Sequence, residues 1–300
     1  MTRADLDERA AQLRAAGQPF VRARVVLALK PTSAKPGDEA IVHADGSIEG
    51  FVGGVCAESS VRLQSLRVLE TGEPLLLHLR PDEESEGAED LARDGVVVAH
   101  NPCLSGGELE IFLEPCLPAP RLAVAGQTPI AQALGELAPR VGFDVVDVSG
   151  EGAEVDANDA AVVVAAHGRD EEAVLTAALR TGIPYVGLVA SETRGAAVRH
   201  SLDLPEELRA QLHCPAGLPI GGRTPEEIAL SILAQIVAER HRAPAGAPRQ
   251  PAPAVAIDPV CGMEVAASEA SLHLDVDGER RYFCSEHCRE RFAAEHTHHG

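Results

Sequence analysis

The sequence predicts an α/β protein with an N-terminal α+β domain, a parallel-sheet domain and a small C-terminal module. Residues 1–118 combine helices with hairpin-forming strands, and strands alternate with helices along residues 119–242. A Pro- and Ala-rich linker at residues 243–256 then precedes a cysteine-bearing segment at residues 257–296. With 300 residues, of which 45% are hydrophobic, the chain can build two cores and a smaller unit.

The net charge and the cysteine content exclude some classes of partner and favour some kinds of chemistry. The net charge of -20 opposes binding to a nucleic-acid backbone or to an anionic membrane surface. Residues 1–17 carry too many charges for a signal peptide, and no apolar run approaches the roughly 20 residues that span a bilayer. Seven cysteines without a secretory signal favour thiol chemistry or metal binding over a disulfide framework. We therefore expect a cytoplasmic protein with no nucleic-acid or membrane partner.

Hydrophobic periodicity and turn residues give the elements of the N-terminal domain. Thr2 and Asp5 form a capping box at the start of the first helix. Asp45-Gly46 is typical of a hairpin turn, because both positions tolerate positive φ. The predicted elements are helices over residues 2–16 and 57–71 and strands over residues 21–29, 40–43, 47–52, 75–79 and 108–113.

A glycine-rich turn precedes the second of these helices. Gly53 and Gly54 leave backbone N–H groups open, and Cys56 follows them near the helix N-terminus. The helix dipole at that position favours a thiolate, so Cys56 is a candidate for sulfur chemistry or for ligating a soft metal. A small residue that packs a tight turn explains Cys56 equally well.

A second turn of small residues repeats this chemistry. Cys103 lies beside Gly106 and Gly107, directly before the strand that begins at residue 108. Three prolines then mark a domain boundary at Pro115, Pro118 and Pro120.

Residues 121–148 are typical of a βαβ unit of the Rossmann type. Gly126 opens the turn between the first strand and the helix, which aims backbone N–H groups and a helix N-terminus at a ligand phosphate. The dinucleotide-binding pattern requires glycine two positions later, where this chain has Thr128 followed by Pro129. The segment therefore still predicts a Rossmann-type fold, but it departs from the glycine pattern that predicts binding of a nicotinamide cofactor.

The next apolar strand, residues 160–165, ends at His167. Ligands of open α/β sheets bind beyond the carboxyl ends of the strands, so we expect this loop at the same crevice as Gly126. His167 can bind or polarise a ligand there, and Arg169 or Asp170 can hydrogen-bond it, although a satisfied loop residue is the commoner outcome for an isolated histidine. The remaining predicted elements are helices over residues 171–180 and 191–199, a strand over residues 185–189 and a helix opened by Thr224, Pro225 and Glu227.

Three cysteines fall within thirty residues near the end of the chain. Cys284 and Cys288 are four apart and meet across one turn at the start of a predicted helix, residues 285–294. Cys261 adds a third thiolate from a predicted knuckle, and His287 either completes a tetrahedral site or faces solvent. A hairpin around Asp277-Gly278 separates the two parts. We expect a bound metal, zinc or iron, to supply folding free energy to so small a module.

Taken together, these motifs resemble the XdhC/CoxI family of xanthine dehydrogenase accessory proteins over about residues 10–240. Residues 258–292, with DPVCGM and YFCSEHCRERF, are similar to the YHS domain, a small metal-associated module. The matching XdhC/CoxI pieces are Gly50–Glu58, Asn101–Pro115, the strand-turn-helix at Arg121, His167–Asp170 and Pro215–Glu227. The resemblance implies an N-terminal α+β domain, a Rossmann-like parallel-sheet domain and a YHS-like metal-binding module.

The same resemblance implies a maturation factor with no catalytic residue of its own, rather than a metabolic enzyme. Such a factor binds molybdenum cofactor (molybdopterin), assists its sulfuration and inserts it into a molybdenum hydroxylase of the xanthine or carbon monoxide dehydrogenase type. A cysteine desulfurase and a second copy of the chain are further candidate partners. The implied cofactor-binding residues are Gly53, Gly54, Cys56, Glu58, Cys103, Gly106, Gly107, Gly126, Thr128, Asp147, His167 and Asp170.

Two alternatives stay open. An NAD(P)-dependent oxidoreductase would use Asp147 on the ribose and His167 as an acid, although Thr128 counts against it. A metal sensor or metal-trafficking protein would use the C-terminal module as its functional part and the rest of the chain as a scaffold.

Overall fold

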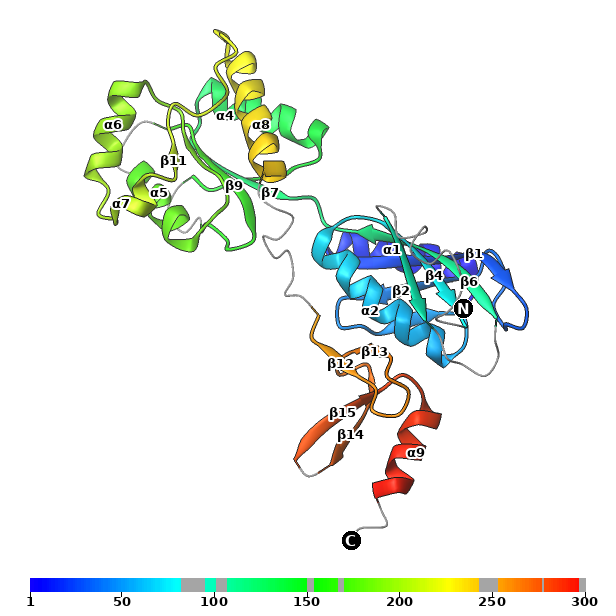
Figure 1. The fold of residues 1–300 in the computed structure, drawn as a ribbon. Helices are drawn as coiled ribbons and strands as arrows, with labels where there is room; N and C mark the ends of the chain where they lie inside the picture. The colour runs from blue at the N-terminus through cyan, green and yellow to red at the C-terminus, as the bar shows by residue number, and fades with distance from the viewer. Residues whose placement is uncertain are drawn as a thin grey trace. The chain divides into compact units, whose positions relative to one another are not determined.

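The computed structural model describes residues 1–81, 95–100, 107–149, 154–166, 170–242, 253–276 and 278–296. The chain divides into two compact units, Met1–Pro118 with Gly246–Gly300, and Ala119–Ala245 (Figure 1). The fold class is α/β, as predicted, with a parallel sheet in the second unit. Within the described ranges no helix is both long and apolar enough to cross a membrane.

A six-stranded sheet forms the N-terminal domain in the order β3-β2-β1-β6-β4-β5. The capping box of Thr2 and Asp5 is present, and β2 and β3 pair as the predicted antiparallel hairpin. The elements are α1 (Arg3–Ala15), β1 (Phe20–Leu29), β2 (Glu39–His43), β3 (Ile48–Gly50), α2 (Val55–Thr71), β4 (Leu75–Arg80), β5 (Val96–His100) and β6 (Glu108–Cys116).

Two strands differ from the sequence prediction. β5 was not predicted, and it pairs in parallel with β4 at the edge of the sheet. β6 continues past Leu113 and through Pro115 to Cys116. Proline is tolerated there because the pairing of β6 with β4 stops at Leu113, so Pro115 has a hydrogen-bonded neighbour strand on the β1 side only.

The two helices cover opposite faces of this sheet. Buried side chains of α2, such as Val61 and Leu69, share a cluster with Val21 and Val25 of β1. Leu6, Ala10 and Leu13 of α1 pack instead with Phe20 and Ile41, whose side chains alternate to the other face. This packing fixes the first turn of α2 at the end of the glycine-rich segment.

The second unit is a five-stranded parallel sheet in the order β11-β10-β9-β7-β8. Leu122 and Val163 pack against α4 and α8 on one face, and Ala123 and Val164 pack against α5 and α6 on the other (Figure 1). The elements are β7 (Arg121–Ala125), α4 (Pro129–Leu137), the short 3-10 helix η1 (Ala138–Val141), β8 (Asp144–Asp147), β9 (Asp159–Val164), α5 (Asp170–Thr181), β10 (Val186–Leu188), α6 (Glu192–Ser201), α7 (Glu206–Arg209), β11 (Leu212–His213) and α8 (Pro225–Arg242).

The strand order reverses between β7 and β9. From β7 the chain goes outward to β8, then returns to β9 on the other side of β7. Such a reversal leaves a crevice beyond the carboxyl ends of the two strands, which is where open α/β sheets bind their ligands. In this chain the crevice lies at Gly126 and Ala165.

The C-terminal module consists of two hairpins and a helix. The predicted hairpin β14 (Leu272–Val276) with β15 (Glu279–Phe283) and the helix α9 (Glu286–His296) are both present. A further hairpin, β12 (Val255–Ile257) with β13 (Glu264–Ala266), was not predicted and carries the cysteine knuckle in its turn. Met263, Val265 and Phe283 form the small core of the module.

Candidate functional site

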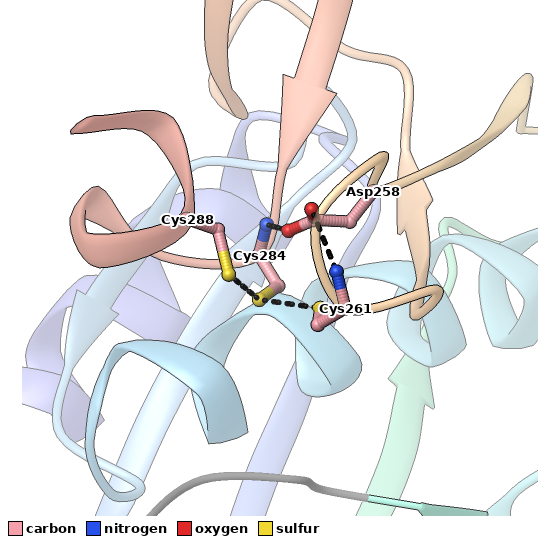
Figure 2. A group of neighbouring side chains, drawn as sticks. All are labelled: Asp258, Cys261, Cys284 and Cys288. Atoms are coloured by element: carbon pink, nitrogen blue, oxygen red, sulfur yellow. Dashed lines mark hydrogen bonds between the residues drawn. The ribbon is translucent and has the colours of Figure 1, made fainter. Parts of the chain in front are cut away.

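Four side chains of the C-terminal module converge on one point. Asp258, Cys261, Cys284 and Cys288 each offer a ligand atom, and these atoms lie within 4.8 Å of one another (Figure 2). The Sγ atom of Cys284 lies 3.5 Å from that of Cys261 and 3.7 Å from that of Cys288. The structure thus brings together the three cysteines whose spacing in the sequence predicts a metal site.

The Asp258 carboxylate holds the two parts of this cluster in place. One oxygen accepts hydrogen bonds from the N–H groups of Val260 (2.9 Å) and Cys261 (3.4 Å), and the other accepts from Cys284 (2.8 Å). Burial alone would raise the Asp258 pKa, but the hydrogen bonds from Cys284 and Val260 lower it below its ordinary value. Asp258 is therefore an ionised carboxylate that ties the β12–β13 turn to the end of β15.

The thiols of Cys261 and Cys284 are held in their protonated form when no cation is present. Burial raises the pKa of Cys261 to about 11. A hydrogen bond with Cys56 and burial both raise the pKa of Cys284. A bound cation reverses this preference, because it replaces the thiol protons and compensates the charge of the thiolates.

The sulfur spacing fits a tetrahedral cation. With a metal–sulfur bond of about 2.3 Å, the edge of a tetrahedron of thiolates is roughly 3.8 Å. The Sγ distances of 3.5 and 3.7 Å are close to that edge. His287 is exposed and is not part of the group found among the described residues. Zinc or another thiophilic cation therefore suits this donor set.

A second candidate site is the crevice of the parallel-sheet unit. Gly126 has φ of +123°, and an added Cβ would lie 2.3 Å from the carbonyl oxygen of Ala165. Its N–H donates to Ser149 Oγ at 2.7 Å, so this group, which the sequence pattern aims at a ligand phosphate, is used within the protein. Thr128 Oγ1 donates to the Ala165 carbonyl at 2.8 Å and accepts from the Ala131 N–H at 3.3 Å, which caps α4.

Asp147 is part of the same hydrogen-bond network. Its carboxylate accepts from the Ser149 N–H at 2.8 Å and from Gln127 Nε2 at 2.9 Å. The hydrogen bonds from Ser149 lower the Asp147 pKa below its ordinary value, with a smaller contribution from Gln127. Asp147 therefore positions the turn that supports Gly126.

A cavity of about 320 Å³ opens at this crevice. The N-terminal residues of α4 and α8 both reach it, and Arg223 adds a cation just before α8. Arg223 was not among the residues selected from the sequence, although it lies in the Pro215–Glu227 piece of the family resemblance. The lining residues are Thr128, Pro129, Ile130, Ala165, Val189, Arg223, Pro225 and Ile228.

The conformation of the first glycine-rich turn explains why glycine occupies positions 53 and 54. Gly53 has φ of +136°, and a Cβ there would lie 3.0 Å from Ala57 Cβ. Gly54 is the N-cap of α2, and Cys56 follows in its first turn. Burial raises the pKa of Glu58 in the same turn, an effect that Arg62 opposes. This turn shapes the start of α2, and the structure places Cys56 against the cysteine cluster.

The second predicted turn is described only in part. A Cβ on Gly107 would lie 2.1 Å from the carbonyl oxygen of Pro31, so this glycine is required for close packing. Cys103, Gly106 and His167 lie outside the described residues. Asp170 begins α5, and its side chain also lies outside the described part.

Three family matches account for most of the chain. Residues 13–80 match the XdhC and CoxI family, and residues 122–236 match the XdhC Rossmann domain. The chain belongs to the XdhC and CoxI family. Residues 256–297 match the YHS domain, so the cysteine cluster described above lies in a YHS domain that follows the two XdhC parts.

Three curated proteins are similar to this chain in sequence. The Escherichia coli (strain K12) protein YqeB, which is described as uncharacterized, is 31% identical over 81% of this chain and 47% of its own length. The Escherichia coli molybdenum cofactor insertion chaperone PaoD is 25% identical over 69% of this chain and 80% of its own. A Bacillus subtilis (strain 168) protein described as a probable xanthine dehydrogenase subunit is 26% identical over 44% of this chain and 46% of its own. The chain thus spans about half the length of two of these three relatives.

Proposed function

We propose that the protein is a maturation factor that binds molybdenum cofactor, assists its sulfuration and helps to insert it into a molybdenum hydroxylase. The observation that carries the proposal is the cavity at the switch point of the XdhC Rossmann domain, where two helix N-termini and Arg223 surround an apolar pocket. A relative named as a molybdenum cofactor insertion chaperone supports the proposal.

The lining of the cavity suits a pterin that carries a phosphate. Arg223 offers a cation for the phosphate at the edge of the cavity, where α4 and α8 begin. Ile130, Val189 and Ile228 offer apolar surface to a flat ring system. When bound, molybdopterin supplies the dithiolene that holds molybdenum, while this chain binds the cofactor, orients it and shields it from water. Thr128 and Asp147 act through the turn that they support.

The proposal includes the partners of such a factor. A molybdenum hydroxylase is the client, and a cysteine desulfurase supplies the sulfur in the cytoplasm. The XdhC and CoxI family match and the relative described as a probable xanthine dehydrogenase component support the client class. Cys56 and Cys103 are the candidate residues for the sulfur side of the cofactor.

Replacement of Arg223 by alanine in the full chain tests the cavity. Loss of a charge-assisted contact to phosphate weakens binding by about 1.5 kcal/mol or more, so we expect about a tenfold lower affinity for molybdopterin. Pterin fluorescence after acid release of the cofactor measures the occupancy. Arg140→Ala is the matched control, because Arg140 is an exposed arginine of the same unit and does not line the cavity.

The outcome that would overturn the proposal is equally concrete. If the protein purified from a host that loads a client hydroxylase contains neither molybdenum nor releasable pterin, it does not carry the cofactor. Binding of NADH at the same cavity, lost in the Arg223→Ala variant, would favour the oxidoreductase alternative.

The cysteine cluster favours a second candidate function, that of metal trafficking or metal sensing through the YHS domain. Under that function Cys284→Ser abolishes metal-dependent activity in the native host, whereas Arg223→Ala has no effect on it.

A further inference from the structure

Helix α2 of the N-terminal domain and the YHS domain belong to one compact unit and contact each other. Arg67, near the end of α2, lies 3.0 Å from Glu264 of β13 in an ion pair. At the other end of the helix, Cys56 packs against the buried cluster that contains Met263, Cys284 and Cys288. The YHS domain therefore lies along α2 from its first turn to Arg67.

The first turn of α2 brings a fourth sulfur to the cysteine cluster. The Cys284 thiol is hydrogen-bonded with Cys56, as well as lying next to Cys261. The pale blue ribbon of α2 passes beside the sulfur atoms in Figure 2. Cys56 and Cys284 are 228 residues apart in the chain, so only folding brings their side chains together.

The other candidates for a fourth ligand are less suitable. Both oxygens of Asp258 already accept backbone N–H groups, from Val260 and Cys261 on one side and from Cys284 on the other. Withdrawing the carboxylate would leave these N–H groups without an acceptor, and for the buried N–H of Cys284 this costs about 1–3 kcal/mol. His287 and Cys56 both lie outside the group of four convergent side chains, but His287 is exposed, whereas Cys56 is hydrogen-bonded with Cys284 and packs against the cluster.

We propose that Cys56 is the fourth ligand of a tetrathiolate zinc site that joins the N-terminal domain to the YHS domain. Zinc is the occupant because four thiolates in a tetrahedron suit a borderline-soft d10 cation that has no geometric preference of its own. The cavity proposal does not depend on this inference, since the cavity lies in the other compact unit. A zinc-bound Cys56 leaves Cys103 as the candidate for the sulfur side of the cofactor.

The charges balance without a redox partner. Binding of Zn²⁺ forms four Zn–S bonds and releases the thiol protons to solvent, which leaves the zinc with its four thiolates at a net charge of −2 beside the ionised Asp258 carboxylate. Two helix N-termini stabilise this charge. Cys56 is in the first turn of α2, whose N-cap Gly54 has no side-chain hydrogen bond, and Cys288 is in the first turn of α9.

Cobalt substitution of the full chain counts the thiolates directly. The sulfur-to-cobalt charge-transfer absorption grows with the number of thiolate ligands, so Cys56→Ser lowers it by about one quarter at saturation. Competition with a chelator is expected to show at least a tenfold loss of zinc affinity. Cys116→Ser is the matched control, because Cys116 is a partly buried cysteine of the same domain outside the cluster.

Alkylation of the unsubstituted protein gives an independent measurement. Zinc is expected to protect Cys56, Cys261, Cys284 and Cys288 from iodoacetamide and to leave Cys116 and Cys214 reactive, as mapped by peptide mass spectrometry. In Cys284→Ser, zinc no longer protects Cys56. If Cys56 reacts equally fast with and without zinc while the three YHS cysteines are protected, the inference is wrong. This measurement decides the question even if Cys56→Ser does not fold.

Discussion

The crevice of the Rossmann domain and the cysteine cluster of the YHS domain are built in different ways. Strand ends, helix N-termini and the tight approach of Gly126 to Ala165 make the crevice, with Arg223 as its main charged side chain. Side chains alone make the cluster, and a single carboxylate, Asp258, holds its two parts. The crevice is therefore most sensitive to substitutions that fill its space, whereas the cluster is most sensitive to substitutions that remove a ligand atom.

The largest effect is expected from filling the space at Gly126. Gly126→Val puts a β-branched side chain at φ of +123° and a Cβ 2.3 Å from the Ala165 carbonyl oxygen, so β7 and β9 must separate. We expect a loss of about 4 kcal/mol in the free energy of unfolding of the Rossmann domain. Urea denaturation of the full chain, followed by circular dichroism, measures it.

Gly135→Ala is the control for this substitution. Gly135 lies in α4 with open space around its Cβ position, so alanine there is expected to stabilise the helix by up to about 1 kcal/mol. If both variants were equally stable, the crevice would not depend on the close approach at Gly126.

In the cysteine cluster, loss of one ligand atom is expected to have the largest effect on metal binding. Cys284→Ser removes the central sulfur of the group and is expected to lower zinc affinity about a hundredfold, without affecting pterin binding in the crevice. Chelator competition and pterin release, performed on the same sample, separate the two sites. Loss of both ligands together would show that the comparison is wrong and that the sites are coupled.

The smallest effect concerns the carboxylate of the crevice. Asp147→Asn weakens the hydrogen bonds to Ser149 and Gln127, and because the side chain is exposed we expect a loss of only about 0.5 kcal/mol. The Asp147 pKa is lowered in the folded state, so this difference is fully present above the ordinary value of 3.8 and disappears as the pH falls through the folded value. Unfolding of both proteins between pH 2 and pH 7 checks it, and a difference that grew at low pH would contradict the assignment.

The sequence predicted the elements whose pattern is local. The capping box at Thr2, the Asp45-Gly46 hairpin and the strand-turn-helix at Gly126 depend on neighbours within a few residues, and the structure contains all three. β5 was missed because a short edge strand with half-buried residues has no clear alternation. The same limit applies to β12 and β13, which are three residues each.

The parts of the sites that escaped prediction depend on long-range pairs. The hydroxyl of Ser149 accepts a hydrogen bond from the N–H of Gly126, 23 residues away in the chain, and neither segment alone indicates this contact. Arg223 reaches the cavity only because α8 packs beside α4. The sequence predicted Cys56 near a helix N-terminus, either as a reactive thiol or as a small residue that packs a tight turn. Its neighbours in the YHS domain follow from the packing of α2. Spacing along the chain therefore predicts that Cys284 and Cys288 lie close together, but it cannot predict that Cys56 lies close to either of them.

The contact between Cys56 and Cys284 has a consequence for biosynthesis. α2 leaves the ribosome long before the YHS domain does, because the two sulfurs are separated by 228 residues, so a tetrathiolate site can close only after residues 261–288 have emerged. Only a chain in which the N-terminal domain has packed against the YHS domain would then bind zinc at full affinity. A truncated or misassembled chain would hold the metal through fewer ligands and lose it first to a competing chelator.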